Sequence, residues 1–101
     1  MAKQRRRARK TRLGDPAAVH TRKLATALEL MEDFTRQGEN SLRNGLCRTA
    51  AEALTTAIEA RGAAKEHRSA GGLTKTQRLT DANVAVQRLR LKVLETCTRD
   101  D

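Results

Sequence analysis

The chain has 101 residues and a formal net charge of +9, with 21 Lys and Arg residues against 12 Asp and Glu residues. This length accommodates one domain with a tail, and a single Phe without Trp or Tyr requires a core of small and medium aliphatic side chains. No apolar run is long enough for a membrane span, and no apolar segment follows the basic N-terminus as in a secretory signal, so we expect a cytoplasmic protein with no membrane partner.

The positive charge is concentrated in the first fourteen residues, which carry seven cations and no acid. Residues 15–101 hold the other fourteen cations together with all twelve acids, so their net charge is only +2. Blocks of like charge resist folding and usually act as interaction arms. We therefore predict a flexible arm over 1–14 and a helical bundle domain over 15–101. The cations of the arm are Lys3, Arg5, Arg6, Arg7, Arg9, Lys10 and Arg12.

The first predicted helix spans about residues 15–37. Asp15 is suited to the N-cap and Pro16 to the first helical position. Apolar residues then recur at steps of three and four, which is typical of one face of a helix. They are Ala17, Leu24, Ala27, Leu28, Met31 and Phe34. The segment 38–41, Gly-Glu-Asn-Ser, is expected to stop this helix and to cap the next one.

The second predicted helix spans about residues 41–69, and its many alanines favour helix formation and close packing. Gly62 either ends it early or merely weakens it. Gly71-Gly72 predicts a firm break. The apolar face of this helix comprises Leu46, Cys47, Ala50, Leu54, Ala57 and Ile58.

The third predicted helix spans about residues 74–98, with Thr74 and Gln77 placed as a capping box. Its apolar residues form the clearest periodic pattern in the chain, a heptad-like seam. They are Leu79, Ala82, Val86, Leu89, Val93 and Thr96. No segment alternates like a half-buried strand, so the predicted fold class is all-α, with three helices after a basic arm.

A short break between two long helices makes them antiparallel neighbours. Folding the chain about residue 72 pairs apolar residues along this hairpin and places Cys47 opposite Cys97. Because a short, aromatic-poor chain buries little surface, we expect a homo-oligomer or a subunit of a nucleoprotein complex.

The two cysteines could form a disulfide or share a metal, but two reduced cysteines packed as small apolar residues are the favoured interpretation. Neither belongs to a CxxC motif, and His20 and His67 lie far apart in the sequence, so we expect neither a metal nor a cofactor. No set of catalytic residues stands out, which indicates a non-enzymatic protein.

Residues 2–10, Ala-Lys-Gln-Arg-Arg-Arg-Ala-Arg-Lys, resemble the arginine-rich RNA-binding motif of lambdoid phage N-type antitermination proteins. Those arms fold into a bent helix on an RNA hairpin. The resemblance covers nine residues, and it departs from that family in the packed helices expected over 15–101. It implies a mode of RNA binding rather than a role in antitermination. By this resemblance the RNA would be faced by Ala2, Arg5, Arg6, Arg7, Arg9 and Lys10.

The function predicted from these features is non-enzymatic nucleic-acid binding through the phosphate backbone. Arginine fits phosphate through a forked donor array and stacks on bases, which favours RNA slightly over DNA. Helical cations could add a second basic surface at the end of the hairpin away from Gly71-Gly72. They are Arg43, Arg48, Arg88, Arg90 and Lys92. The alternatives are a helical adaptor, chaperone or assembly subunit, and a helix-turn-helix DNA-binding regulator.

Overall fold

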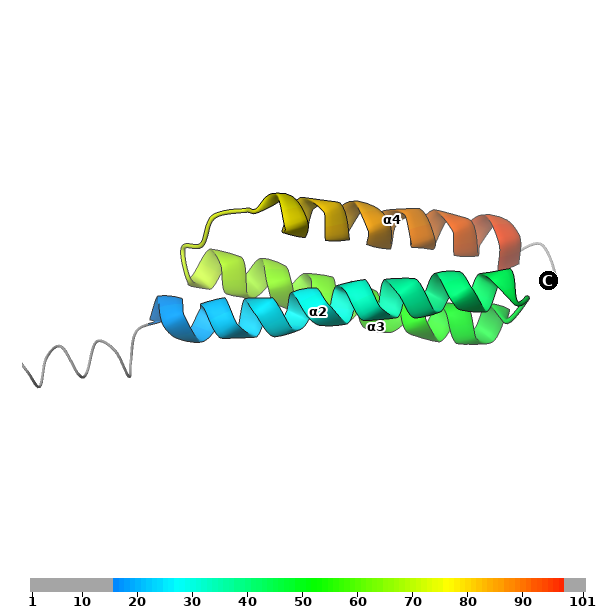
Figure 1. Cartoon of the computed structure of the whole chain (residues 1–101), viewed down its shortest axis with the longest axis horizontal. Coiled ribbons are helices and arrows are strands. Elements are labelled where there is room, and N and C mark those ends of the chain that lie inside the picture. The colour runs from blue at the N-terminus through cyan, green and yellow to red at the C-terminus, as the bar shows by residue number, and fades with distance from the viewer. Residues whose placement is uncertain (1–15, 98–101) are drawn as a thin grey trace, which may run out of the picture.

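The computed structural model describes residues 16–97, which form three packed helices and, within that range, no strand (Figure 1). Helix α2 spans Pro16–Arg43, α3 spans Cys47–Ala70 and α4 spans Gln77–Cys97. Figure 1 shows α3 returning along α2, and α4 then running in the direction of α2. The predicted all-α class is confirmed. The predicted arm, residues 1–14, lies outside the described residues.

The end of α2 differs from the prediction. The segment 38–41 does not stop the helix, which continues to Arg43. The chain reverses instead at Gly45, which has φ +73°. The Leu46 N–H then donates to the Ser41 carbonyl oxygen at 2.8 Å. This is the Schellman arrangement, in which a glycine beyond the helix takes the left-handed conformation, so the second helix begins at residue 47 rather than 41.

The predicted break at Gly71-Gly72 is confirmed, and the chain forms the same Schellman arrangement there. Gly72 has φ +61°, and the Leu73 N–H donates to the Arg68 carbonyl oxygen at 2.8 Å. Gly62 lies within α3 and does not divide it. Of the two alternatives left open for Gly62, an early end of the helix is therefore excluded.

Helix α4 begins three residues later than predicted. The cap is Thr76, whose hydroxyl oxygen accepts the Leu79 N–H at 3.2 Å. Thr74 therefore lies in the connection between the helices, not at the cap. The segment 71–76 follows the last turn of α3, and the α4 helix begins beyond it.

The core is formed by one stripe from each helix and is rich in small side chains. The largest fully buried side chains are Met31 from α2 and Val86 and Leu89 from α4. Two predictions fail at the edges, because Leu46 and Thr96 are exposed. Buried alanines let a neighbouring helix approach α3 closely, and the single aromatic side chain, Phe34, is only partly buried against this core. The alanines of α3 that are buried are Ala50, Ala53, Ala57, Ala60 and Ala64.

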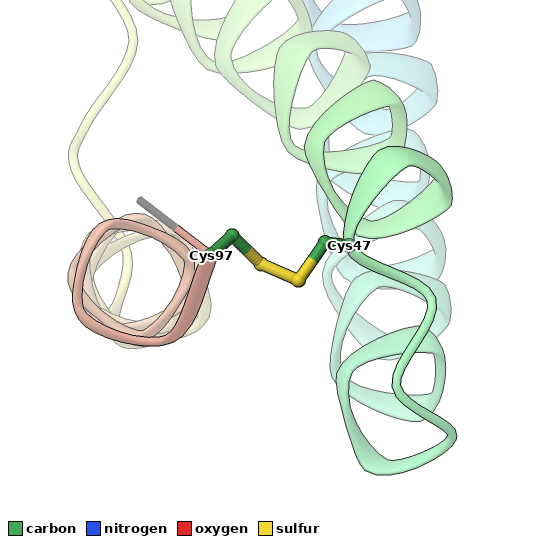
Figure 2. The surroundings of a disulfide bond; sticks show 2 residues. All are labelled: Cys47 and Cys97. Carbon is green, nitrogen blue, oxygen red and sulfur yellow. A yellow bond between two sulfur atoms is a disulfide. The ribbon is translucent and has the colours of Figure 1, made fainter. Parts of the chain in front are cut away.

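Cys47 and Cys97 form a disulfide, with their Cα atoms 5.7 Å apart (Figure 2). The favoured interpretation of two reduced cysteines is therefore wrong. The bond joins the first residue of α3 to the last residue of α4, the two positions that folding about residue 72 places opposite one another. One end of α4 is consequently fixed covalently, and its other end is held by the connection 71–76.

Alanine substitutions at two helical glycines should have opposite effects on stability. A Cβ on Gly38 would lie 2.5 Å from Cδ2 of the fully buried Leu89, whereas a Cβ on Gly62 would meet nothing within 4 Å. Gly62→Ala should raise the free energy of unfolding by about 0.5–1 kcal/mol through helix propensity. Gly38→Ala should lower it by about 1 kcal/mol, because overpacking costs more than this gain.

Urea unfolding of the two variants beside the parent protein would measure this difference. Gly62→Ala is the matched control, since the same substitution is made within a helix but away from the core. If Gly38→Ala is as stable as Gly62→Ala, then the packing of Leu89 does not depend on the absence of a side chain at position 38.

Candidate nucleic-acid interface

The seven cations of the arm lie outside the described residues, but the position where the arm joins the bundle is defined. Helix α2 begins at Pro16, at the same end of the bundle as the connection between α3 and α4 (Figure 1). His20 fixes this arrangement, because its Cβ lies 2.8 Å from the position that a Cβ on Gly71 would occupy. The start of α2, which follows the arm in the sequence, therefore lies at the end of the bundle that carries the Gly-Gly turn.

Two of the predicted helical cations come together at the opposite end of the bundle. Arg43 from α2 and Lys92 from α4 line a small pocket of about 220 Å³. Leu42, Thr96 and the acid Glu39 line the same pocket. The acid offsets part of the positive charge, so this is a mixed surface rather than a purely cationic one.

The other predicted cations are exposed but do not line that pocket. Arg48 belongs to the first turn of α3, while Arg88 and Arg90 belong to α4. Two residues along a helix correspond to a rotation of about 200°. Arg90 therefore faces away from both Arg88 and Lys92, and the predicted basic end is less continuous than the sequence suggested.

A second group of cations is not among the site residues predicted from the sequence. A cleft of about 520 Å³ lies between α3 and α4 at the end that carries the Gly-Gly turn, and we call it the turn-end cleft. The spacing of three of its cations on α3, at steps of four and three residues, is a signal that could have identified this face. The cleft is lined by Ile58, Arg61, Gly62, Lys65, Arg68, Lys75, Leu79 and Asn83.

Two further basic side chains of the bundle are neutralised by acids. Arg78 donates to both carboxylate oxygens of Glu32, from Nε at 2.9 Å and from a terminal nitrogen at 2.6 Å. This forked pair joins α4 to α2. Arg36 lies 3.5 Å from Asp33 on the exposed face of α2. The hydrogen bond from Arg78, aided by the charges of Arg78 and Arg36, lowers the pKa of Glu32.

The lowered pKa of Glu32 predicts a loss of stability in acid. A folded-state pKa below the unfolded value stabilises the fold above the unfolded pKa, about 4.3 for Glu. That contribution is lost as the pH falls through the folded pKa. Because the pair is partly exposed, we expect less than about 1 kcal/mol. Unfolding of Glu32→Gln from pH 7 to 3 should show a difference from the parent that shrinks below about pH 5.

Glu95→Gln is the control for this measurement, because Glu95 is exposed and forms no ion pair within residues 16–97. A difference between parent and Glu32→Gln that does not change with pH would contradict the role assigned to the Arg78 pair.

The two histidines, which are 47 residues apart in the sequence, meet in the structure. Nδ1 of His20 and Nδ1 of His67 are 2.9 Å apart, so one nitrogen donates and the other accepts. Among residues 16–97, no group of three or more His, Cys, Asp or Glu side chains is placed to hold a metal ion. The histidine pair is thus best described as a contact that packs the start of α2 against the last turn of α3.

Within the described range, none of the helices combines the length and the apolarity needed to cross a bilayer. Comparisons of the chain with protein-family models, with curated proteins and with solved structures gave no match.

Proposed function

We propose that the protein is a non-enzymatic nucleic-acid-binding accessory protein, with the bundle as platform and residues 1–14 as the arm that grips the phosphate backbone. The observation that carries this proposal is the separation of charge along the chain. Seven cations and no acid precede Asp15, whereas the remaining residues are almost balanced. A tethered cluster of like charge with so little opposing charge is suited to a polyanion.

The composition of the arm supports RNA slightly more than DNA. Arginine outnumbers lysine five to two in residues 1–14. Guanidinium groups make forked contacts with phosphate and stack on bases exposed in RNA loops. Each neutralised phosphate also releases condensed counterions, which makes such binding tight at low salt. The resemblance of residues 2–10 to an arginine-rich RNA-binding motif supports the same mode of contact.

The bundle offers features that support its role as a platform. Its helices span 28, 24 and 21 residues, and α4 is linked to α3 by a disulfide, so a contacting arm would be attached to a rigid body. Arg43 and Lys92 face one pocket and could contact a backbone at the far end. We propose that the protein acts as a homo-oligomer or as a subunit of a nucleoprotein complex.

A second candidate function is that of a helical adaptor or assembly subunit. It is favoured by one observation, a row of exposed apolar side chains on α4. Val84, Leu91 and Leu94 are 43%, 49% and 47% exposed, and their spacing of seven and three residues places them along one side of the helix. A helix-turn-helix regulator has less support, because its two short helices and tight turn correspond poorly to long helices joined through 71–76.

Binding to an RNA hairpin and to duplex DNA, measured at two salt concentrations with and without residues 1–14, tests the proposal. Affinity that falls steeply with salt and depends on the arm would support nucleic-acid binding. Weak binding that responds little to salt, together with an intact protein complex, would favour the adaptor instead.

A further inference from the structure

The turn-end cleft carries an uncompensated positive charge. Four of its eight lining residues are cations, Arg61, Lys65, Arg68 and Lys75, and none is an acid. Within residues 16–97, these four side chains form no ion pair and no side-chain hydrogen bond, unlike those of Arg36 and Arg78. Like charges held close together repel one another, and an anion between them relieves that repulsion.

The shape of the cleft follows from the helix boundaries. Because α4 begins only at Gln77, the connection 71–76 rather than a helix passes the last turns of α3. Gly62 adds no side chain to the cleft, and a Cβ there would meet nothing within 4 Å. Leu79 is buried and Ile58 half-buried, so the floor is apolar beneath a cationic rim. A concave surface with one sign of charge and apolar walls concentrates its field on a ligand.

The cations are spaced for an extended anion rather than for a single ion. Arg61, Lys65 and Arg68 follow one face of α3 and rise about 10 Å along its axis. In one strand of duplex DNA this distance spans about three phosphates. Lys75 comes from the connection and approaches from the other side. An elongated polyanion can therefore contact several of these groups at once.

We infer that the turn-end cleft binds the sugar–phosphate backbone of the nucleic acid that the arm grips. This inference rests on the proposed function and adds a contact on the folded domain. The cleft and the first turns of α2 lie at the same end of the bundle, because His20, early in α2, contacts both His67 and the Gly71 turn. A backbone held in the cleft thus lies near the start of α2, whereas the pocket of Arg43 and Lys92 lies at the other end of that helix, whose last residue is Arg43.

The test compares two variants of the full chain that lose the same charge. Lys65→Gln/Arg68→Gln removes two cations of the cleft, and Arg22→Gln/Lys23→Gln removes two exposed cations of α2 that do not line it and, within residues 16–97, form no ion pair. Glutamine has a helix propensity close to that of Lys and Arg, so both variants should fold. Lys75→Gln, in the connection, is a further variant that leaves the helices unchanged. The probe is a fluorescently labelled RNA hairpin.

The cleft variant should bind the hairpin on the order of tenfold to a hundredfold more weakly than the control variant at about 0.1 M salt. The slope of log affinity against log salt should fall by about 0.7–0.9 for each cation removed. Lys75→Gln should show about half of this effect. Equal affinity and slope for the cleft and control variants would overturn the inference.

The outcomes separate this inference from the proposed function. If deletion of residues 1–14 abolishes binding and the cleft variant binds normally, the cleft does not bind nucleic acid and the proposed role of the arm stands. If the cleft variant loses binding and the deletion has no effect, the arm does not bind nucleic acid and the inference about the cleft is supported. A parent protein that binds neither RNA nor DNA would overturn both. Polyglutamate is a competitor for binding of the labelled hairpin. If it displaces the hairpin as well as unlabelled RNA does at equal charge, the cleft is a site for an acidic protein segment and the inference is overturned.

Discussion

Deleting residues 1–14 is expected to lower the affinity for an RNA hairpin or duplex DNA by at least two orders of magnitude at about 0.1 M salt, without unfolding the bundle. The affinity should fall because the deletion removes seven of the 21 cations and no acid. The fold should survive because α2 begins at Pro16, beyond the deleted residues, and the buried side chains of the described part of the chain come from residues 27–93.

The salt dependence gives this result its physical meaning. Each phosphate neutralised on duplex DNA contributes about 0.9 to the slope of log affinity against log salt. Seven contacts would give a slope of about −6, which corresponds to a loss of three to five decades of affinity between about 50 and 200 mM salt. The shortened chain should retain only the slope due to cations of the bundle. Fluorescence anisotropy of labelled nucleic acid measures both quantities.

A charge-preserving variant separates the guanidinium group from the charge alone. Replacing the five arginines of the arm by lysine keeps the same number of cations but removes the forked donor array. The salt slope should persist while the affinity for a hairpin with exposed loop bases falls. Circular dichroism and thermal unfolding confirm that the fold is retained. If the full chain and the chain without residues 1–14 bind nucleic acid with the same affinity, the proposal that the arm contacts nucleic acid is wrong.

Replacing Cys47 and Cys97 together by alanine is expected to lower the free energy of unfolding by about 4 kcal/mol, the largest stability effect that the structure predicts. The disulfide closes a loop across a sequence separation of 50 residues. The unfolded chain loses much of its conformational freedom when such a loop is closed. Because a domain of this size is stable by only about 5–15 kcal/mol, the loss should lower the melting temperature on the order of 20 °C.

The same protein under reducing conditions is the control for this prediction. A reductant breaks the disulfide but changes no other side chain. If the reduced parent and the double variant have the same free energy of unfolding, the loss of stability is due to the missing cross-link. Counting free thiols in denaturant before and after reduction verifies the starting state. A melting temperature that reductant does not change would contradict the assignment of the stabilisation to this bond.

The disulfide also bears on where the protein resides. Disulfides persist mainly in oxidising environments and are uncommon in the cytosol. The sequence predicted a cytoplasmic protein with two reduced cysteines, and the structure pairs the cysteines. The predicted reduced state is therefore wrong, and cytoplasmic location stays a prediction.

The sequence by itself determined the fold class and most of the core. Apolar residues at steps of three and four predict the buried stripes of α2 and α4, and Leu79, Ala82, Val86, Leu89 and Val93 are all buried. Periodicity succeeds there because a helical face is a local property of the chain. The arm is also predicted from the sequence alone, by a run of seven cations without an acid, and this prediction lies outside the described residues.

Only the tertiary structure decided how glycines and cations are used. Gly38 was expected to end a helix, but it lies within α2, and Leu89 of α4 packs where a side chain at this position would be. The turn-end cleft likewise depends on distant parts of the chain, since Arg61 and Lys75 face one space only after α3 and α4 are packed. A local pattern records propensity, whereas a close approach or a shared cleft is set by packing between segments.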